Sequence, residues 1–283
     1  MTKTCRACLI LCALLLLYPW FPAPAGAQDY QPHIGQRGKD VIWVPTPDNH
    51  VETMLDMAEV TAADFVIDLG SGDGRIVIAA ARRGATALGI EFNPDMVELS
   101  RRNADKAGVS GRATFEQADL FEVDLGRASV ITMYLLPDIN LKLRPKLLDL
   151  APGTRVVSHA FSMEEWTPDR SAVNNAVNLY CWIVPAKVGG AWTWTEGSVP
   201  VALELTQNFQ EIKGTALFGD SPEPVRDAKL QGDWIAFSLG GNSYSGRVTP
   251  GSIRGTPGSI RGTVRTPGGE AEWVASRPSP DAP

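Results

Sequence analysis

Glycines and carboxylates alternate in the segment 68–75, which reads Asp-Leu-Gly-Ser-Gly-Asp-Gly-Arg. The apolar run 65–67 precedes it and the apolar run 76–81 follows it, so it is predicted to join a buried strand to a helix that opens at Arg75. Glycines in such a turn adopt positive φ and let a ligand approach the backbone. The free N–H groups at the start of the helix attract a carboxylate or a phosphate. The segment therefore predicts a ligand-binding turn.

The spacing of these glycines separates two kinds of ligand. A dinucleotide site follows the pattern Gly-x-Gly-x-x-Gly, whose third glycine would fall at the position held by Arg75. The pattern present is Asp-x-Gly-x-Gly-x-Gly, with an acid ahead of the first glycine. A dinucleotide-binding oxidoreductase is therefore disfavoured.

The pattern present resembles motif I of the class I S-adenosylmethionine-dependent methyltransferases. The resemblance implies that the cofactor is S-adenosyl-L-methionine and that the turn carrying Gly70, Gly72 and Gly74 passes under its amino-acid end. It also implies that Asp68 contacts this end, directly or through water. The fold that it implies is α/β and Rossmann-like.

Two further carboxylates stand where the resemblance expects them. Glu91 ends the apolar run 85–90, 21 residues past Gly70, and is expected to hold both ribose hydroxyls. Asp119 follows the predicted third strand and is expected near the adenine amino group. A tight turn without a ligand is the alternative interpretation of the glycines, and three acids at three strand ends make it the weaker one.

A narrower resemblance extends over roughly residues 44–168. The segment 68–81 is similar to the glycine motif of the seven-strand lysine methyltransferases that modify the c-ring protein of ATP synthase and the adenine nucleotide carrier. Weaker similarities are Val-Pro-Thr-Pro at 44–47, Pro137 after an apolar strand, and Trp-Thr-Pro at 166–168. The resemblance implies a protein lysine as acceptor, and a small-molecule or quinone-like acceptor stays open. Those relatives act inside organelles, and the C-terminal extension of this chain is not associated with them.

Methyl transfer demands mainly that the acceptor be placed in line with an electrophilic methyl group and that water be excluded. Tyr134 follows the fourth predicted strand, at the carboxyl edge of the sheet, and is the candidate catalytic residue that orients the nucleophile. Its alternative is an aromatic rim residue. His159 is either a base or a hydrogen-bonded structural histidine. Thr46 and Pro47 either cover the cofactor or only cap a helix, with Thr46 as N-cap.

The remaining pattern predicts a parallel sheet with helices on both faces, because strands alternate with helices. The last two strands have no helix between them and are predicted to form an antiparallel hairpin. After the predicted first helix, the elements expected are a helix over 95–107, a strand over 128–136, a helix over 141–150, and strands over 155–158, 179–184 and 191–195. The class I methyltransferase domain, with an N-terminal lead-in, is expected over residues 28–197.

A change of pattern predicts a small C-terminal antiparallel β module over residues 198–277, with a tail over 278–283. Helical periodicity ends, and short alternating runs lie between Gly, Pro and Asp turns, as in an open barrel or a half-sandwich. The segment 249–255 is repeated without change at 256–262, which indicates a duplication within a hairpin. The module either binds a substrate polypeptide or envelope component, or covers a sheet face.

The N-terminal segment 1–27 has the layout of a secretory signal peptide. Lys3 and Arg6 precede the apolar run 7–18, and small residues lead to an expected cleavage between Ala27 and Gln28. An exported protein of the periplasm or cell envelope is therefore predicted, with an uncleaved membrane anchor or a misassigned start as alternatives. Membrane contact is expected only through this segment.

Charge and cysteine content bound the remaining possibilities. The net charge of −6 disfavours nucleic acid as the partner. Only Cys181 remains after the predicted cleavage, so no internal disulfide is expected and a buried structural thiol is predicted. His33 and His50 have no companion ligands, so no metal site is predicted. The prediction is an exported methyltransferase, and the competing class is a non-catalytic exported binding protein with a relic Rossmann domain.

Overall fold

The computed structural model describes residues 30–251 and 258–278. The predicted signal peptide, most of the first copy of the duplicated heptapeptide and nearly all of the predicted tail lie outside these residues. In the part that is described, no helix is long and apolar enough to cross a membrane.

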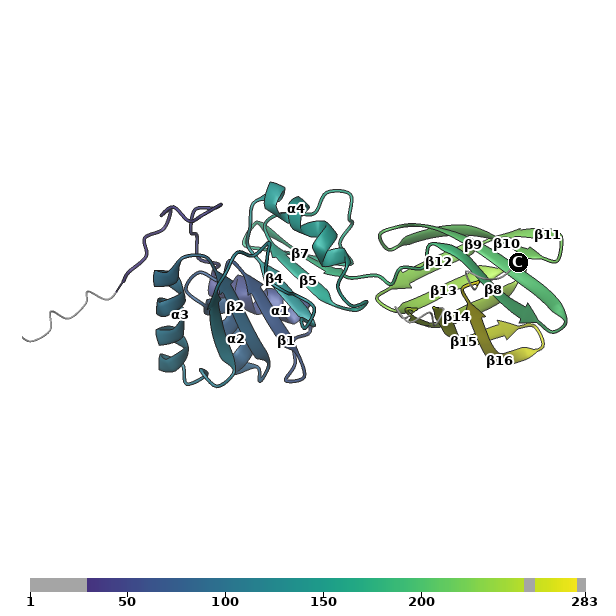
Figure 1. Ribbon diagram of the computed structural model, residues 1–283, viewed down its shortest axis with the longest axis horizontal. Helices are drawn as coiled ribbons and strands as arrows, with labels where there is room; N and C mark the ends of the chain where they lie inside the picture. Colours follow the sequence, from purple (N-terminus) through teal and green to yellow (C-terminus); the bar gives the residue numbers. More distant parts are fainter. Residues whose placement is uncertain (1–29, 252–257, 279–283) are drawn as a thin grey trace, which may run out of the picture. The chain divides into compact units, whose positions relative to one another are not determined.

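The first sheet has seven strands in the order β3-β2-β1-β4-β5-β7-β6 (Figure 1). Strands β1 to β5 run parallel, whereas β7 pairs antiparallel with both β5 and β6. The strands are β1 (Phe65–Leu69), β2 (Thr86–Glu91), β3 (Ala113–Gln117), β4 (Val130–Met133), β5 (Arg155–His159), β6 (Arg170–Asn174) and β7 (Val177–Ile183). The order reverses between β1 and β4, and such a point opens a crevice at the carboxyl ends of the strands.

Helices cover both faces of this sheet, as predicted. The helices are α1 (Asp48–Met57), α2 (Arg75–Arg82), α3 (Pro94–Lys106) and α4 (Pro137–Leu148). Val66 of β1 packs in a core with α1, α2 and α3, whereas its neighbour Ile67 packs in a second core with α4. Successive side chains of a strand point to opposite faces, so the continuous apolar run of β1 supplies both cores.

Two predictions for the first sheet and its helices are wrong. Pro47, not Thr46, is the N-cap of α1, and its ring has no group that could accept a hydrogen bond from the helix. The antiparallel hairpin consists of β6 and β7, and the run 191–195 lies instead in β8 of the second sheet. An alternating run does not reveal which sheet it joins, and the weakly patterned edge strand β6 gave no clear signal. The change of sheet therefore falls between β7 and β8, whereas the domain boundary was expected at 197/198.

The predicted helix bounds shift slightly for local reasons. Helix α4 begins at Pro137 rather than at 141, because a proline at the first position leaves no N–H unsatisfied. Helix α3 begins at Pro94, and the side chain of Asn93 caps it by accepting from the backbone N–H of Asp95 at 2.9 Å. Cys181 is buried in β7, as expected of a structural thiol, and burial raises its pKa to about 11. Trp166 is buried against the sheet, with its ring centroid 5.9 Å from that of Trp182 in β7.

The second sheet has nine antiparallel strands in the order β11-β10-β9-β8-β16-β15-β14-β13-β12, which confirms the predicted class of the C-terminal module. All neighbours in sequence pair except β11 and β12, and β8 pairs with β16, so the sheet coils on itself and is open between β11 and β12. The strands are β8 (Gly190–Glu196), β9 (Val199–Asn208), β10 (Glu211–Phe218), β11 (Ser221–Pro224), β12 (Arg226–Gln231), β13 (Trp234–Leu239), β14 (Asn242–Thr249), β15 (Ser259–Thr266) and β16 (Gly269–Ser276). Its interior is a separate core that includes Trp192, Trp194 and Trp273.

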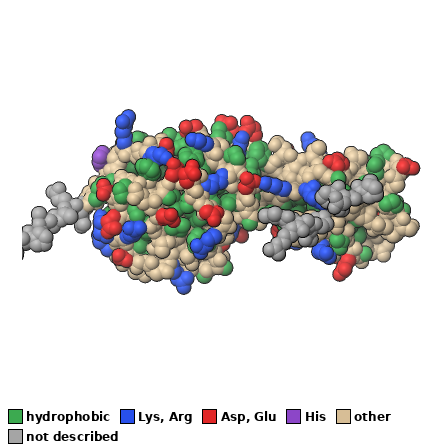
Figure 2. Space-filling model, in the orientation of Figure 1, with side chains coloured by type: hydrophobic (Ala, Val, Ile, Leu, Met, Phe, Trp, Pro, Cys, Tyr) green, Lys and Arg blue, Asp and Glu red, His purple; other side chains and the backbone are tan. Residues whose placement is uncertain are grey.

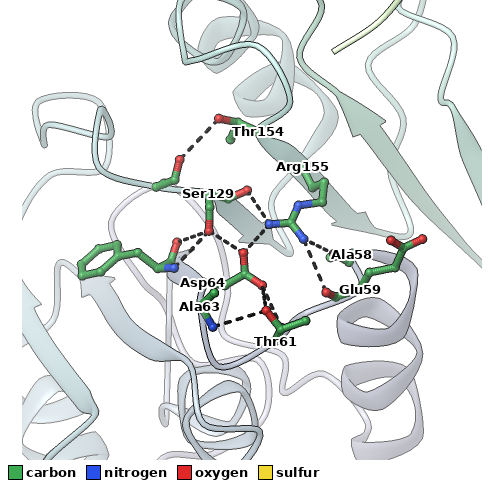
Figure 3. A network of polar contacts seen from close by, with 10 residues as sticks. Ala58, Glu59, Thr61, Ala63, Asp64, Ser129, Thr154 and Arg155 are labelled. Carbon is green, nitrogen blue, oxygen red and sulfur yellow. Dashed lines mark hydrogen bonds and ion pairs between the residues drawn. The ribbon is translucent and has the colours of Figure 1, made fainter. Parts of the chain in front are cut away.

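A polar network fixes the amino ends of three strands in the first sheet (Figure 3). Asp64, directly before β1, is 7% exposed and pairs with Arg155, the first residue of β5. The hydroxyl of Ser129, before β4, donates to Asp64 at 2.7 Å, and the backbone N–H of Thr61 donates to the other carboxylate oxygen at 2.7 Å. Arg155 also donates to the carbonyl oxygen of Ala58, at the end of α1, at 2.8 Å. This network lies at the opposite edge from the glycine turn and serves stability.

Candidate active site

A cavity of about 260 Å³ opens at the carboxyl ends of β1, β2 and β4. The glycine loop, residues 70–74, forms one wall, and the ends of β2 and β4 form others. The lead-in segment, residues 36–46, lines the remaining side. The cavity lies where the strand order reverses, the position at which open α/β sheets bind their ligands.

The glycine loop has the conformation that its sequence predicts. Gly70, Gly72 and Gly74 have φ of 76°, 55° and 82°. Gly70 and Gly72 line the cavity, and a Cβ on Gly72 would lie 2.6 Å from the indole nitrogen of Trp43. Gly74 does not line it, and a Cβ there would lie 2.7 Å from the ring of Phe115. Close packing alone explains Gly74, and its contact with the cofactor stays a prediction.

Asp68 is the buried carboxyl of the site. Its side chain is 2% exposed, lines the cavity and accepts a hydrogen bond from the hydroxyl of Thr132 at 2.7 Å. Burial, together with the charges of Asp73 and Glu91, raises the pKa of Asp68 to about 7. The hydrogen bond from Thr132 acts in the opposite direction and lowers this pKa. A cationic group that entered the cavity would favour the ionised form of this carboxyl.

Glu91 lies at the end of β2, on the cavity wall, as predicted. One carboxylate oxygen accepts from the backbone N–H of Gly72 at 3.0 Å, and the other accepts from that of Asn93 at 2.9 Å. These two bonds fix the carboxylate, and each oxygen retains a lone pair for a hydroxyl donor. Glu91 is thus oriented to accept from a diol.

Asp119 lines the cavity beyond β3 and has two partners in this structure. It accepts from the backbone N–H of Phe121 at 2.9 Å and forms an ion pair with Lys39 of the lead-in segment. The hydrogen bond and charge of Lys39 lower the pKa of Asp119. The ammonium of Lys39 also lies 4.8 Å from the ring centroid of Phe92. A ligand that uses Asp119 must share it with Lys39 or displace Lys39.

Tyr134 lines the cavity just past β4, together with the apolar residues Leu136, Ile139 and Phe161. Its ring centroid lies 4.0 Å from that of His159, the last residue of β5. The structure places His159 behind Tyr134 rather than on the cavity wall, which favours the structural interpretation of this histidine. Burial, with the charge of His50, lowers the pKa of His159 to about 4.

Sequence reasoning missed three residues that shape the site. Arg75 lines the cavity, donates to the carbonyl oxygen of Thr46 at 2.8 Å and forms an ion pair with Asp73. Trp43 lies against the glycine loop, and its partial burial between apolar neighbours gave no sequence signal. His50 bonds to His159, and its helical spacing to the buried Met54 could have placed it on the inner face of α1. Thr46 lines the cavity, so covering the cofactor remains its predicted role.

The donor set fits S-adenosyl-L-methionine. A buried carboxyl suits the cofactor's ammonium group, a carboxylate fixed by backbone N–H groups suits a ribose diol, and the loop around Gly72 leaves room that a Cβ would fill. Within the described residues, no group of three or more His, Cys, Asp or Glu side chains is arranged to hold a metal ion.

Comparison with known proteins identifies the family. The model of the ANTKMT methyltransferase domain matches residues 68–170. A protein-lysine N-methyltransferase of Saccharolobus islandicus is 42% identical over 160 residues, which are 53% of this chain and 95% of that protein. The mouse adenine nucleotide translocase lysine N-methyltransferase is 41% identical over 130 residues, which are 45% of this chain and 56% of that protein.

A solved structure agrees with the fold and the cofactor. An RNA methyltransferase from Salinibacter ruber, in complex with S-adenosyl-L-homocysteine, is 51% identical, with a TM-score of 0.51 over 51% of this chain and 96% of that one. The resemblance drawn from the glycine motif is confirmed. The cavity, its carboxylates and these relatives together show that the chain is an S-adenosyl-L-methionine-dependent methyltransferase of the protein-lysine N-methyltransferase family.

Proposed function

We propose that this protein transfers the methyl group of S-adenosyl-L-methionine to lysine amines of a protein acceptor. The observation that carries the proposal is the contrast between two parts of the cavity lining. Asp68, Glu91 and Asp119 supply carboxylates from β1, from β2 and from just beyond β3, and Tyr134 supplies an aromatic ring beside apolar residues past β4. The names of the relatives from Saccharolobus islandicus and mouse support lysine as the acceptor.

The apolar part of the lining suits a lysine amine for two reasons. A lysine amine must lose its proton before it can attack, and apolar surroundings lower the pKa of an ammonium group. The ring faces of Tyr134 and Phe161 can also hold the cationic methylated product. The cofactor supplies an electrophilic methyl group on a sulfonium, so the protein has to orient the amine and exclude water. We assign the orienting role to Tyr134.

The carboxylates are assigned to the cofactor. Asp68 would bind its ammonium group, Glu91 its ribose hydroxyls and Asp119 its adenine amino group, with Gly70 and Gly72 leaving room for its amino-acid end. Asp119 has to share its carboxylate with Lys39 or release that residue when adenine binds.

An RNA acceptor is the second candidate, because the Salinibacter ruber relative is described as an RNA methyltransferase. The net charge of −6 weighs against it. On the face shown in Figure 2, acidic and basic side chains are interspersed among the coloured residues, and the basic ones form no continuous stripe. A small-molecule acceptor is the third candidate.

The test is transfer of a labelled methyl group to a cell-envelope extract. Label on lysine is expected in acid-hydrolysed protein, sensitive to protease and insensitive to ribonuclease. Asp68→Ala and Glu91→Ala are expected to reduce transfer at least ~10-fold, because each removes a contact to the cofactor. Glu98→Ala, an exposed acid of α3, is the matched control and should transfer normally.

Each other outcome assigns a different function. Ribonuclease-sensitive label would replace lysine with RNA as the acceptor, and label in a small-molecule fraction would favour the third candidate. Cofactor binding without transfer to any fraction would favour a non-catalytic binding protein. Transfer that persists in both variants would overturn the assignment of these carboxylates.

We further propose that residues 1–27 direct export and that the protein acts in the periplasm or cell envelope. The layout of charged, apolar and small residues in this segment supports the proposal. Mass spectrometry of the protein isolated from fractionated cells should find Gln28 as the first residue. An unprocessed chain in the cytosol would refute export, and an unprocessed chain in the membrane would favour the anchor.

A further inference from the structure

Two buried histidines from distant parts of the chain form a direct contact. His50 lies in the first turn of α1 and His159 ends β5, and each side chain is 3% exposed. Nδ1 of His50 lies 2.8 Å from Nε2 of His159. The outer nitrogens, Nε2 of His50 and Nδ1 of His159, have no hydrogen-bond partner among the described residues. The contact between the two rings is therefore the bond that orients both of them.

The chemistry of this contact requires one proton between the two rings. Two neutral imidazoles satisfy it, with one nitrogen donating and the other accepting. A charged ring would add an N–H without an acceptor in a buried place, which is costly. Accordingly, burial, together with the repulsion that a charged His50 would exert, holds the pKa of His159 near 4. At neutral pH His159 is therefore an uncharged, oriented ring.

The oriented ring is the surface on which Tyr134 rests. Their centroids are 4.0 Å apart at an interplanar angle of 55°, and Phe161 faces Tyr134 at 6.4 Å. Tyr134 lines the cavity, whereas neither histidine does. A direct proton transfer from the acceptor to the pair is thus not available, and the contact acts through the position of the tyrosine ring.

We propose that the His50–His159 pair positions Tyr134 in the apolar part of the cavity lining, with His50 fixing the rotation of His159 and His159 fixing the tyrosine ring. The inference rests on the proposed function, in which Tyr134 orients the acceptor amine. Because α1 follows directly on the lead-in segment and β5 leads directly to Phe161, the pair also links two parts of the chain that line the cavity. His50 and His159 are positioning residues and make no contact with the reacting atoms.

The test compares two replacements of His50 with opposite hydrogen-bonding capacity. His50→Phe keeps a flat ring and removes the bond, whereas His50→Asn keeps a polar atom close to the position of Nδ1. His50→Phe is expected to lower kcat about 10-fold and to raise the acceptor KM, with the dissociation constant of S-adenosyl-L-methionine within about twofold of wild type. His50→Asn is expected to restore kcat to within about threefold. His33→Phe replaces an exposed histidine and serves as the matched control.

A double-mutant cycle separates positioning from a general effect on the fold. In a Tyr134→Ala background, His50→Phe should change kcat less than twofold, because the ring that it positions is gone; independent sites would instead give additive losses. Additive losses, or a weakened cofactor affinity in His50→Phe, would overturn the proposal. If His50→Phe fails to fold, His159→Gln, which removes the ring beside Tyr134 but keeps a polar atom near Nε2, replaces it in the same cycle. It should lower kcat about 10-fold when Tyr134 is present and less than twofold in the Tyr134→Ala background.

An NMR measurement that does not depend on methyl transfer distinguishes failure of the positioning role from failure of the proposed function. In the wild type the Tyr134 ring is expected to rotate slowly, which NMR shows as separate signals for the two sides of the ring. In His50→Phe the ring is expected to rotate fast, so that these signals average to one. Tyr134→Phe assigns the signals among the five tyrosines of the chain. If the ring shows this change but lysine is not methylated, the acceptor is wrong and the positioning stands. If the ring rotates equally in both proteins, the positioning is wrong.

Discussion

The buried carboxyl of Asp68 predicts that cofactor binding releases a proton. Burial raises its pKa to about 7 in the cofactor-free protein, while the hydroxyl of Thr132 donates to it at 2.7 Å. The amino-acid end of S-adenosyl-L-methionine carries an ammonium group, and a carboxylate binds it better than a neutral carboxyl does. Near neutral pH about half of the molecules should therefore lose a proton when the cofactor binds.

The magnitude follows from this pKa. Below it, each pH unit lowers the apparent affinity about 10-fold, or about 1.4 kcal/mol, so binding at about pH 6 should be roughly 10-fold weaker than at about pH 8. Calorimetric titration in two buffers of different protonation enthalpy gives the affinity and the number of protons released, expected to approach one at about pH 6. Asp68→Asn should bind at least ~10-fold more weakly at about pH 8 and lose the coupled proton.

Two results would refute this reasoning. One is equal affinity at both pH values with no proton released, and the other is proton release that persists in Asp68→Asn. Asp95→Asn removes an exposed acid from the first turn of α3 and should behave as wild type in every titration.

The same carboxyl predicts that the cofactor-free protein becomes less stable as pH rises, whereas its affinity for the cofactor increases. Its folded-state pKa of about 7 lies above the unfolded value, so its contribution to stability is lost as pH rises from about 4 to about 7. The loss is at most about 4 kcal/mol. Asp68→Asn should therefore raise the calorimetric Tm of the cofactor-free protein at about pH 8 and change it little at about pH 4. A lower Tm for Asp68→Asn than for the wild type at about pH 8 would contradict the raised pKa of the buried Asp68 carboxyl.

Two further predictions use matched pairs of variants. Gly72→Ala places a Cβ 2.6 Å from the indole nitrogen of Trp43, whereas Gly108→Ala places one in open space. Both glycines have positive φ, so each substitution should cost about 1 kcal/mol of backbone strain. Only Gly72→Ala should also weaken cofactor binding, by ~10-fold or more. Equal affinities in calorimetric titration would contradict this view of the loop. Arg155→Met leaves Asp64 buried without its guanidinium and should lower the free energy of unfolding by about 3–5 kcal/mol, measured in urea. Arg247→Met removes an exposed ion pair and should cost about 1 kcal/mol or less, and equal costs would show that burial of the first pair is unimportant.

The sequence predicted the cofactor end of the site because its signals are local. A strand, a glycine turn and a helix follow one another within residues 65–82, and the positive φ of Gly70 and Gly72 is a property that glycine supplies by itself. Glu91 could be placed because parallel strands end at one edge of the sheet. The family resemblance rested on the same stretch.

Predictions failed where a local pattern has more than one solution. The alternating run 191–195 was correctly predicted as a strand but assigned to the wrong sheet, because alternation identifies a half-buried strand and not its partners. Thr46 was expected to cap α1, and the cap fell one residue later at Pro47. Helix boundaries depend on the backbone conformation of a single residue, which neighbouring packing decides.

By itself, the sequence determined the strand–turn–helix unit, the cofactor class and the order of the carboxylates along the sheet edge, because each depends on contacts between near neighbours or on the parallel arrangement of strands. Only the tertiary structure decided that Lys39 pairs with Asp119, that the lead-in segment closes one side of the cavity, and that His50 bonds to His159. These contacts join residues 80 and 109 positions apart in the chain. No periodicity records such pairs, because they form when packed layers bring distant side chains within reach.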